Sequence, residues 1–289
     1  MTSRPPSMFV PLVVGAVLMA TACAPADDDA AAPEPGNAAE CVPGDLPTLA
    51  EGVLTVGTDS PAYPPWFADD DPTNGEGFES AVAHAVAEEL GYTAEQVTWT
   101  TVAFNSAIQP GPKDFDFDIN QFSITEERAK AVDFSSPYYD VRQAVVALGD
   151  SEAAGATSAA DLAGLTIGAQ VGTTSYETLV ETIDPEVEPL VYNNNDDAKQ
   201  ALENGQVDAV VFDLPTAFYI TAAELEDAVI VGQLPLLEAE TEHFGLVLDL
   251  DSPLTDCVSA AVDALREDGT LADLEQEWLA EAADAPELG

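Results

Sequence analysis

Val53-Leu54-Thr55-Val56-Gly57, a short apolar run, and the segment from Phe78 to Leu90 that follows it decide the fold class. The first is typical of a buried strand. In the second, Phe78, Val82, Val86 and Leu90 recur at helical spacing, and Gly91 is a helix-ending residue. A strand followed by an amphipathic helix is the unit from which α/β folds are built.

The alternation continues outward from this unit. Ser252 and Pro253 form an N-cap and first-turn pair before a helix that Asp268-Gly269 ends, and Thr270 to Trp278 begins another. We therefore predict an α/β fold with largely parallel sheet. The remaining predicted strands are Val97–Val102, Phe117–Gln121, Leu165–Ala169, Leu190–Tyr192, Ala209–Phe212, Val229–Val231 and Phe244–Leu248.

Length and charge limit the function. A chain of 289 residues with 46% hydrophobic residues can form one elongated domain or two lobes. Its 7 basic against 54 acidic residues exclude a nucleic-acid binder and an anionic membrane surface as partner. The acidity is explained either by an acidic surface common to the lineage or by adaptation to salt.

The N-terminus reads as a targeting segment. Arg4 precedes the apolar stretch 8–22, which is too short to span a bilayer, and Ala20-Thr21-Ala22-Cys23 closes it. The segment resembles a bacterial lipoprotein signal, so residues 1–22 are expected to be removed and Cys23 to carry lipid. The alternative is an ordinary secretory signal with an incidental cysteine. Residues 23–45, rich in Ala, Pro and Asp, are predicted to form a flexible tether.

The other two cysteines, Cys41 and Cys257, form an even pair in an exported chain, where disulfides persist. We predict a bridge between them, the alternative being two free thiols. It would join the start of the folded region to a C-terminal helix.

Polar and aromatic residues without an obvious core role follow several predicted strands. Ligands in open α/β sheets bind outside the carboxyl ends of the strands, so these residues are expected to meet in one crevice. They are Asp59, Phe104, Ser123, Thr173, Thr174 and Asp213.

Several segments together resemble the extracytoplasmic solute-binding proteins of ABC importers, polar amino-acid family. The resemblance implies a two-lobed periplasmic-binding-protein-like fold with two hinge crossings, near Tyr139–Val145 and Pro235–Phe244. It implies a discontinuous lobe 1 (46–141 and 238–289) and a lobe 2 (142–237). The segments are Val56-Gly57-Thr58-Asp59, Tyr63-Pro64-Pro65, Gly77-Phe78-Glu79, Ile124 to Arg128, Val132 to Tyr139, Gly172 to Ser175, Val207 to Val210, Asp213-Leu214-Pro215 and Phe244-Gly245.

A free amino acid needs a cation for its carboxylate and an anion for its ammonium. Arg128 resembles the family's carboxylate-binding arginine, and its planar fork suits that role. The alternative is that Arg128 only pairs with Glu126, Glu127 or another surface acid. Asp213 resembles the family's ammonium-binding aspartate, the alternative being a helix cap ahead of Pro215.

The remaining candidate residues complete the predicted pocket. Gly172-Thr173-Thr174-Ser175 follows a strand and opens a helix, a place that favours an anion; as an isolated motif it is a capped turn. By resemblance, Ser123 and Thr173 lie on opposite lobes, so a carboxylate held by both would close the cleft. Tyr63, Trp66 and Phe104 are expected to wall the pocket, and Gln121 replaces a smaller residue of many relatives.

The predicted function is a lipid-anchored, extracytoplasmic receptor that delivers a polar amino acid to an ABC permease. We expect a monomer that is not an enzyme, with no cofactor, no metal, no nucleic acid and contact with the membrane through lipid alone. One alternative is a cyclohexadienyl or prephenate-type dehydratase on the same fold, which needs a catalytic acid. Another is a ligand-sensing receptor domain.

Overall fold

The first of two five-stranded sheets has the order β2-β1-β3-β12-β4 in the computed structural model, which describes residues 41–236, 241–279 and 285–289. Strand β1 is parallel to β2 and β3, whereas β12 is antiparallel to β3 and β4. The prediction of a largely parallel sheet is therefore wrong in detail, because two of the four pairings are antiparallel in this sheet and also in the second. Its strands are β1 (Leu54–Thr58), β2 (Val97–Thr101), β3 (Phe117–Asp118), β4 (Asp133–Phe134) and β12 (Val247–Leu248).

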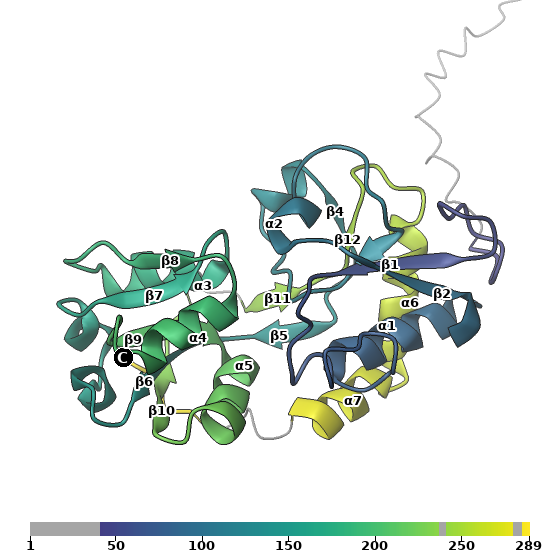
Figure 1. Ribbon diagram of the computed structural model, residues 1–289. Coiled ribbons are helices and arrows are strands. Elements are labelled where there is room, and N and C mark those ends of the chain that lie inside the picture. The colour runs from purple at the N-terminus through teal and green to yellow at the C-terminus, as the bar shows by residue number, and fades with distance from the viewer. Residues whose placement is uncertain (1–40, 237–240, 280–284) are drawn as a thin grey trace, which may run out of the picture. The chain divides into compact units, whose positions relative to one another are not determined.

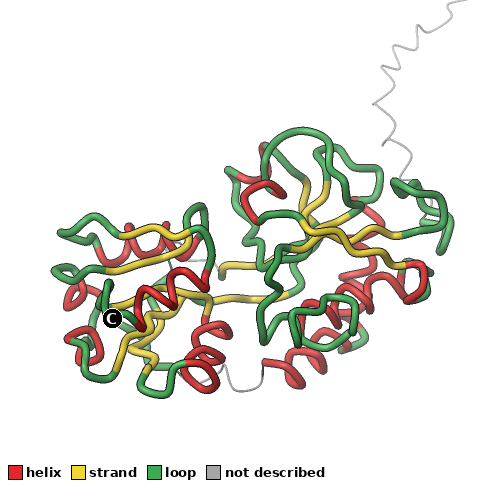
Figure 2. The backbone as a smooth tube through the Cα atoms, viewed as in Figure 1, coloured by secondary structure: helices red, strands yellow, loops and turns green. Residues whose placement is uncertain are grey.

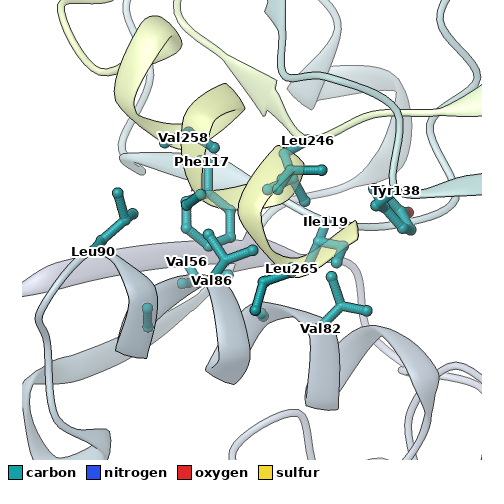
Figure 3. Packing of buried hydrophobic residues seen from close by; sticks show 14 of the residues in the cluster. Val56, Val82, Val86, Leu90, Phe117, Ile119, Tyr138, Leu246, Val258 and Leu265 are labelled. Carbon is teal, nitrogen blue, oxygen red and sulfur yellow. The ribbon is translucent and has the colours of Figure 1, made fainter. Parts of the chain in front are cut away.

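Helices cover both faces of this sheet. On one face lie α1 (Phe78–Glu89), α6 (Thr255–Glu267) and α7 (Thr270–Leu279), and on the other α2 (Phe104–Ala107). Figure 3 shows the larger core, in which apolar side chains of α1 and α6 meet those of the sheet. The spacing that predicted α1 is that of its buried face, which includes Phe78, Val82 and Val86.

The second sheet has the order β10-β6-β9-β7-β8, and it is buried on both faces. In β6, Val145 and Ala147 belong to one core cluster, and Ala144 and Val146 to the other, as the two-residue period of a strand requires. Its strands are β6 (Gln143–Leu148), β7 (Ile167–Gln170), β8 (Leu190–Tyr192), β9 (Ala209–Asp213) and β10 (Ala228–Gln233). The α-helices between these strands are α3 (Thr174–Thr178), α4 (Asn195–Glu203) and α5 (Leu214–Tyr219).

Two strands connect the two sheets. They are β5 (Tyr139–Val141) and β11 (Glu242–Phe244), which pair antiparallel with Glu242 opposite Val141. Figure 1 labels them between the two groups of elements, and Figure 2 shows them as strands. The predicted fold class, α/β with two lobes and two crossings, is confirmed. Lobe 1 below means the part around the first sheet, and lobe 2 the part around the second.

The disulfide between Cys41 and Cys257 is present. Residues 41–45, the end of the predicted tether, are therefore attached to the fold, by the disulfide to Cys257 and by a hydrogen bond from Gly44 N to Leu90 O at 2.9 Å. The predicted signal segment and Cys23 lie outside the described residues. No helix within the described ranges has the length and apolar character to cross a bilayer.

Three boundaries differ from prediction. Helix α6 begins at Thr255 rather than after Ser252, because Ser252 forms a turn whose carbonyl accepts Thr255 N. Strand β3 ends at Asp118, since Gln121 turns the chain with φ 48°. Residues 285–289 contact lobe 2 instead of lobe 1, with Leu288 buried against the second sheet and Leu288 N donating to Gln233 O.

Candidate functional site

One cavity is lined by residues that follow strands of both sheets. Asp59 comes directly after β1, Thr173 follows β7, and Asp213 ends β9. This is the edge of an α/β sheet at which ligands bind. The lining residues are Asp59, Pro61, Tyr63, Phe104, Asn120, Gln121 and Arg128 of lobe 1 and Gln170, Thr173, Thr174, Ser175, Asn194, Asn195 and Asp213 of lobe 2.

The structure thus brings together the residues predicted from the sequence, except for Trp66 and Ser123. Ser123 is nonetheless in contact with the cavity wall, because its Oγ lies 3.0 Å from Thr174 Oγ1. Their roles toward a ligand stay predictions.

Arg128, the first residue of a 3₁₀ turn (Arg128–Lys130), spans the two lobes. Its Nη1 donates to Ser123 O at 2.8 Å and its Nη2 to Gly172 O at 3.0 Å, while the guanidinium lies 5.5 Å from the ring centre of Phe104. Burial lowers the pKa of Arg128, although Glu177, Glu242 and Asp213 act against this. The alternative of a surface pair is wrong for Glu127, which pairs with Lys130.

Asp213 is half-buried at the end of β9 and does not cap α5 with its side chain. Its Oδ1 accepts from Gln143 Nε2 at 2.8 Å. Burial, followed by the negative charge of Glu242, raises the pKa of Asp213 to about 8. The ion pairs among the described residues do not include Asp213, and the positive charge of Arg128 offsets the rise of its pKa only in part.

Thr173 is the N-cap of α3. Its Oγ1 accepts from Tyr176 N at 3.3 Å and donates to Gln170 O at 2.8 Å. The glycine before it is required, because Gly172 has φ 78° and a Cβ there would lie 2.4 Å from Asn105 Oδ1. A side chain at this position would therefore be strained by the positive φ and would require the Asn105 side chain to move.

Asp59 contributes a carboxylate to the cavity wall, and Tyr63 lies beside it as a neutral phenol. Asp59 accepts from Ser60 N at 2.7 Å and from Phe104 N at 3.0 Å, which fixes its carboxylate. Burial raises the pKa of Tyr63, and the charges of Asp196 and Asp59 raise it further.

Gln121 is held by a buried carboxylate. Glu79 accepts from Gln121 N at 2.7 Å, from Gln121 Nε2 and from the Tyr138 hydroxyl. Burial raises the pKa of Glu79 to about 7, and these hydrogen bonds oppose the rise. The larger side chain at 121 is therefore accommodated by a specific partner beneath the pocket.

Trp66 was expected to wall the pocket, but it does not line the cavity. It is fully buried among Phe78, Tyr139 and Phe244, and its Nε1 donates to Thr216 Oγ1 of lobe 2 at 2.9 Å. It contacts the crossing strands because both Tyr139 and Phe244 belong to them.

Several residues at the site were missed from the sequence. Gln143 and Glu242 lie on elements that only tertiary pairing brings together, and neither stands in a motif. The Asn-rich run 193–195 could have been recognised from the sequence, because an asparagine run directly after a predicted strand is typical of a helix N-cap, and Asn194 caps α4 after β8. The residues that were not predicted are Pro61, Asn120, Gln143, Gln170, Ser175, Asn194, Asn195 and Glu242. No group of three or more His, Cys, Asp or Glu side chains that could hold a metal ion occurs in the part of the chain that is described.

Comparison with known proteins identifies the family to which this fold belongs. The family model of bacterial extracellular solute-binding proteins, family 3, matches residues 54–281. The chain belongs to this family. The resemblance inferred from the sequence is thereby confirmed.

This family 3 chain is 30% identical over 246 residues to the L-arginine-binding protein of Pseudomonas aeruginosa, covering 81% of this chain and 90% of that protein. It is 28% identical over 229 residues to the L-cystine-binding protein TcyJ of Escherichia coli, covering 78% and 82%. Among solved structures, an ancestral arginine-binding protein bound to arginine superposes with a TM-score of 0.65 at 32% identity, covering 78% and 97%.

Proposed function

We propose that the protein captures an amino acid, with Arg128 binding the carboxylate and Asp213 the ammonium. One observation carries this proposal: a half-buried guanidinium and a half-buried carboxylate, neither of them in an ion pair among the described residues, line the same cavity from opposite lobes. A zwitterion between them would supply each with an opposite charge and so offset its desolvation.

We further propose that the ligand is a cationic amino acid, with arginine as the first candidate. After Arg128 and Asp213 have been paired with a zwitterion, the carboxylate of Asp59 still lines the cavity. A positive side chain would neutralise it. The arginine-binding relatives are consistent with this choice.

Capture would work by hinge closure. We assign residues 46–141 and 241–279 to lobe 1, and 142–236 together with 285–289 to lobe 2, with β5 and β11 as the crossings. A ligand held by both lobes favours the closed arrangement. We infer that the closed monomer delivers the ligand to an ABC permease and is anchored outside the cell membrane by lipid on Cys23.

We infer that the protein is a receptor and not an enzyme. A dehydratase would need a proton donor in the cavity, and Asp213, with its pKa raised to about 8, is the residue to test for that role. A sensor would need a signalling partner in place of a permease.

The deciding experiment is a thermal-shift screen of the mature protein against L-arginine, L-lysine, L-glutamine, L-cystine and prephenate, followed by calorimetry. We expect arginine to raise the unfolding midpoint most. A shift with prephenate accompanied by release of product would establish the dehydratase, and no shift with any amino acid would reject the receptor.

A further inference from the structure

Glu242 on β11 lies next to the cavity without lining it, and it contacts residues of both lobes. Its Oε1 accepts from Ser123 Oγ at 2.6 Å, and its two oxygens lie 3.4 and 3.2 Å from Gln143 Nε2. Ser123 follows β3 in lobe 1, and Gln143 begins β6 of lobe 2. Thus one side chain of the second crossing contacts a polar group on each side of the cleft.

The first contact fixes the direction of two hydroxyl groups. A hydroxyl has one proton, and that of Ser123 is donated to Glu242. The 3.0 Å contact between Ser123 Oγ and Thr174 Oγ1 then requires Thr174 to donate. Ser123 therefore keeps only acceptor capacity toward a ligand.

The second contact fixes an amide. Gln143 Nε2 donates to Asp213 Oδ1 at 2.8 Å and faces Glu242, so Gln143 Oε1 points the other way and accepts from Ser175 Oγ at 2.7 Å. The hydroxyl proton of Ser175 is therefore donated to Gln143 and is not available to a ligand. The acceptor wall is made by Ser175 and Asp213 of the cavity lining, with Ser123 directly behind Thr174. When a bound ammonium ionises Asp213, this wall offers acceptors and no side-chain donor.

We propose that Glu242 is a positioning residue of the ligand site, which orients Ser123, Thr174 and Gln143 so that this wall selects an ammonium group. The inference rests on the proposed function and deepens it, because it explains how the site distinguishes an amine from an isosteric ligand that lacks one. An ammonium has three donors and no acceptor, which matches the wall.

The variant Glu242→Gln tests the orientation directly. If the new amide turns its NH₂ toward Ser123, the direction of the Ser123–Thr174 bond reverses. If it turns its oxygen there, its NH₂ faces Gln143 Nε2, and Gln143 must rotate and reverse Ser175. In either case the wall acquires a donor that opposes an ammonium.

The probes are L-arginine and 5-guanidinopentanoate, which is arginine without its α-ammonium, and the ratio of their Kd values measures the preference for the amine. We expect Glu242→Gln to reduce this preference at least tenfold, chiefly through weaker arginine binding. Glu275→Gln is the matched control, since Glu275 of α7 is near Tyr139 and Asp140 of the first crossing and outside the site. It should change the ratio less than twofold.

If Glu242 had a merely structural role, the variant would bind both probes more weakly by the same factor, and the ratio of their Kd values would not change. That result overturns the proposal. Should Glu242→Gln fail to fold, Ser123→Ala serves instead, because it removes the acceptor that Glu242 orients, and an unchanged ratio there also overturns it. If the wild-type protein binds neither arginine nor any other amino acid, the proposed function fails first and this inference fails with it.

Discussion

At the scale of single residues, the site combines groups whose charge the surrounding protein does not satisfy. Asp213 has its pKa raised to about 8 and Glu79 to about 7, both chiefly by burial. Arg128 and Asp213 could be predicted as site residues because each belongs to a segment that resembles the family. Glu242 could not, because its contacts depend on β11 pairing with β5 rather than on neighbouring sequence.

The raised pKa of Asp213 predicts a pH-dependent loss of stability. In the unfolded chain the carboxyl group of Asp213 has its ordinary pKa of 3.8, so the folded state binds the extra proton between that pH and about 8. Stability from this group is complete at low pH and is lost as pH rises, by up to about 1.4 kcal/mol per pH unit.

Asp213→Asn should remove this loss. We expect its free energy of unfolding, minus that of the wild type, to grow between pH 4 and 8, while arginine binding is abolished. Urea unfolding of both proteins without ligand at each pH measures the difference. If the free energies of unfolding of the two proteins change with pH in parallel, burial does not destabilise the ionised form of Asp213.

Arg128 should be essential for carboxylate binding. Arg128→Ala leaves a bound carboxylate and Asp213 without their cation, a loss of roughly 3 to 5 kcal/mol, or more than a hundredfold in Kd. Arg128→Lys should also weaken binding, because an ammonium cannot reproduce the fork. Arg266→Ala, which removes an exposed arginine of α6, is the control, and calorimetry with arginine decides. Binding by Arg128→Ala within threefold of the wild type contradicts the assignment.

At the scale of elements, the regular pattern of strands and helices was accessible from the sequence, but the crossings were less so. Strand β6 was not predicted, because its run Gln143–Leu148 continues directly from a crossing segment. Its buried residues alternate between two cores, so it gives no amphipathic signal. Trp66 was placed in the pocket wall because its type suits a ligand, whereas packing against both crossings buries it.

At the same scale, we predict that the disulfide stabilises the fold without shaping the ligand site. Cys41–Cys257 closes a sequence separation of 216 residues, for which the loop model gives about 5 kcal/mol at most. It lies near the end of α1, where Gly44 bonds Leu90, and thus at the edge of the sheet opposite the cavity. We expect Cys41→Ser with Cys257→Ser to lower the unfolding midpoint and to leave the Kd for arginine within twofold. A large loss of affinity would show that the bridge shapes the site.

At the scale of the whole molecule, charge dominates. The formal net charge is −47, and like charges at this density repel one another in the compact state. One cluster of carboxylates makes the effect local: Asp150, Glu203, Glu224, Glu226 and Asp227 surround a depression on lobe 2. Lys199 pairs with Glu224 at 2.8 Å, which leaves the cluster strongly negative.

Added salt should therefore stabilise the protein. The screening length falls from about 10 Å at 0.1 M to about 3 Å at 1 M, so repulsion between surface carboxylates weakens over that range. We expect the unfolding midpoint to rise with sodium chloride and equally with potassium chloride. The variant Asp150→Asn with Glu203→Gln and Glu226→Gln should melt higher than the wild type at 0.05 M salt. The two should converge at 1 M, because screening then does what the substitutions do. If the midpoint is flat with salt, or if the gap between the two proteins persists at 1 M, repulsion is not what limits stability at low salt.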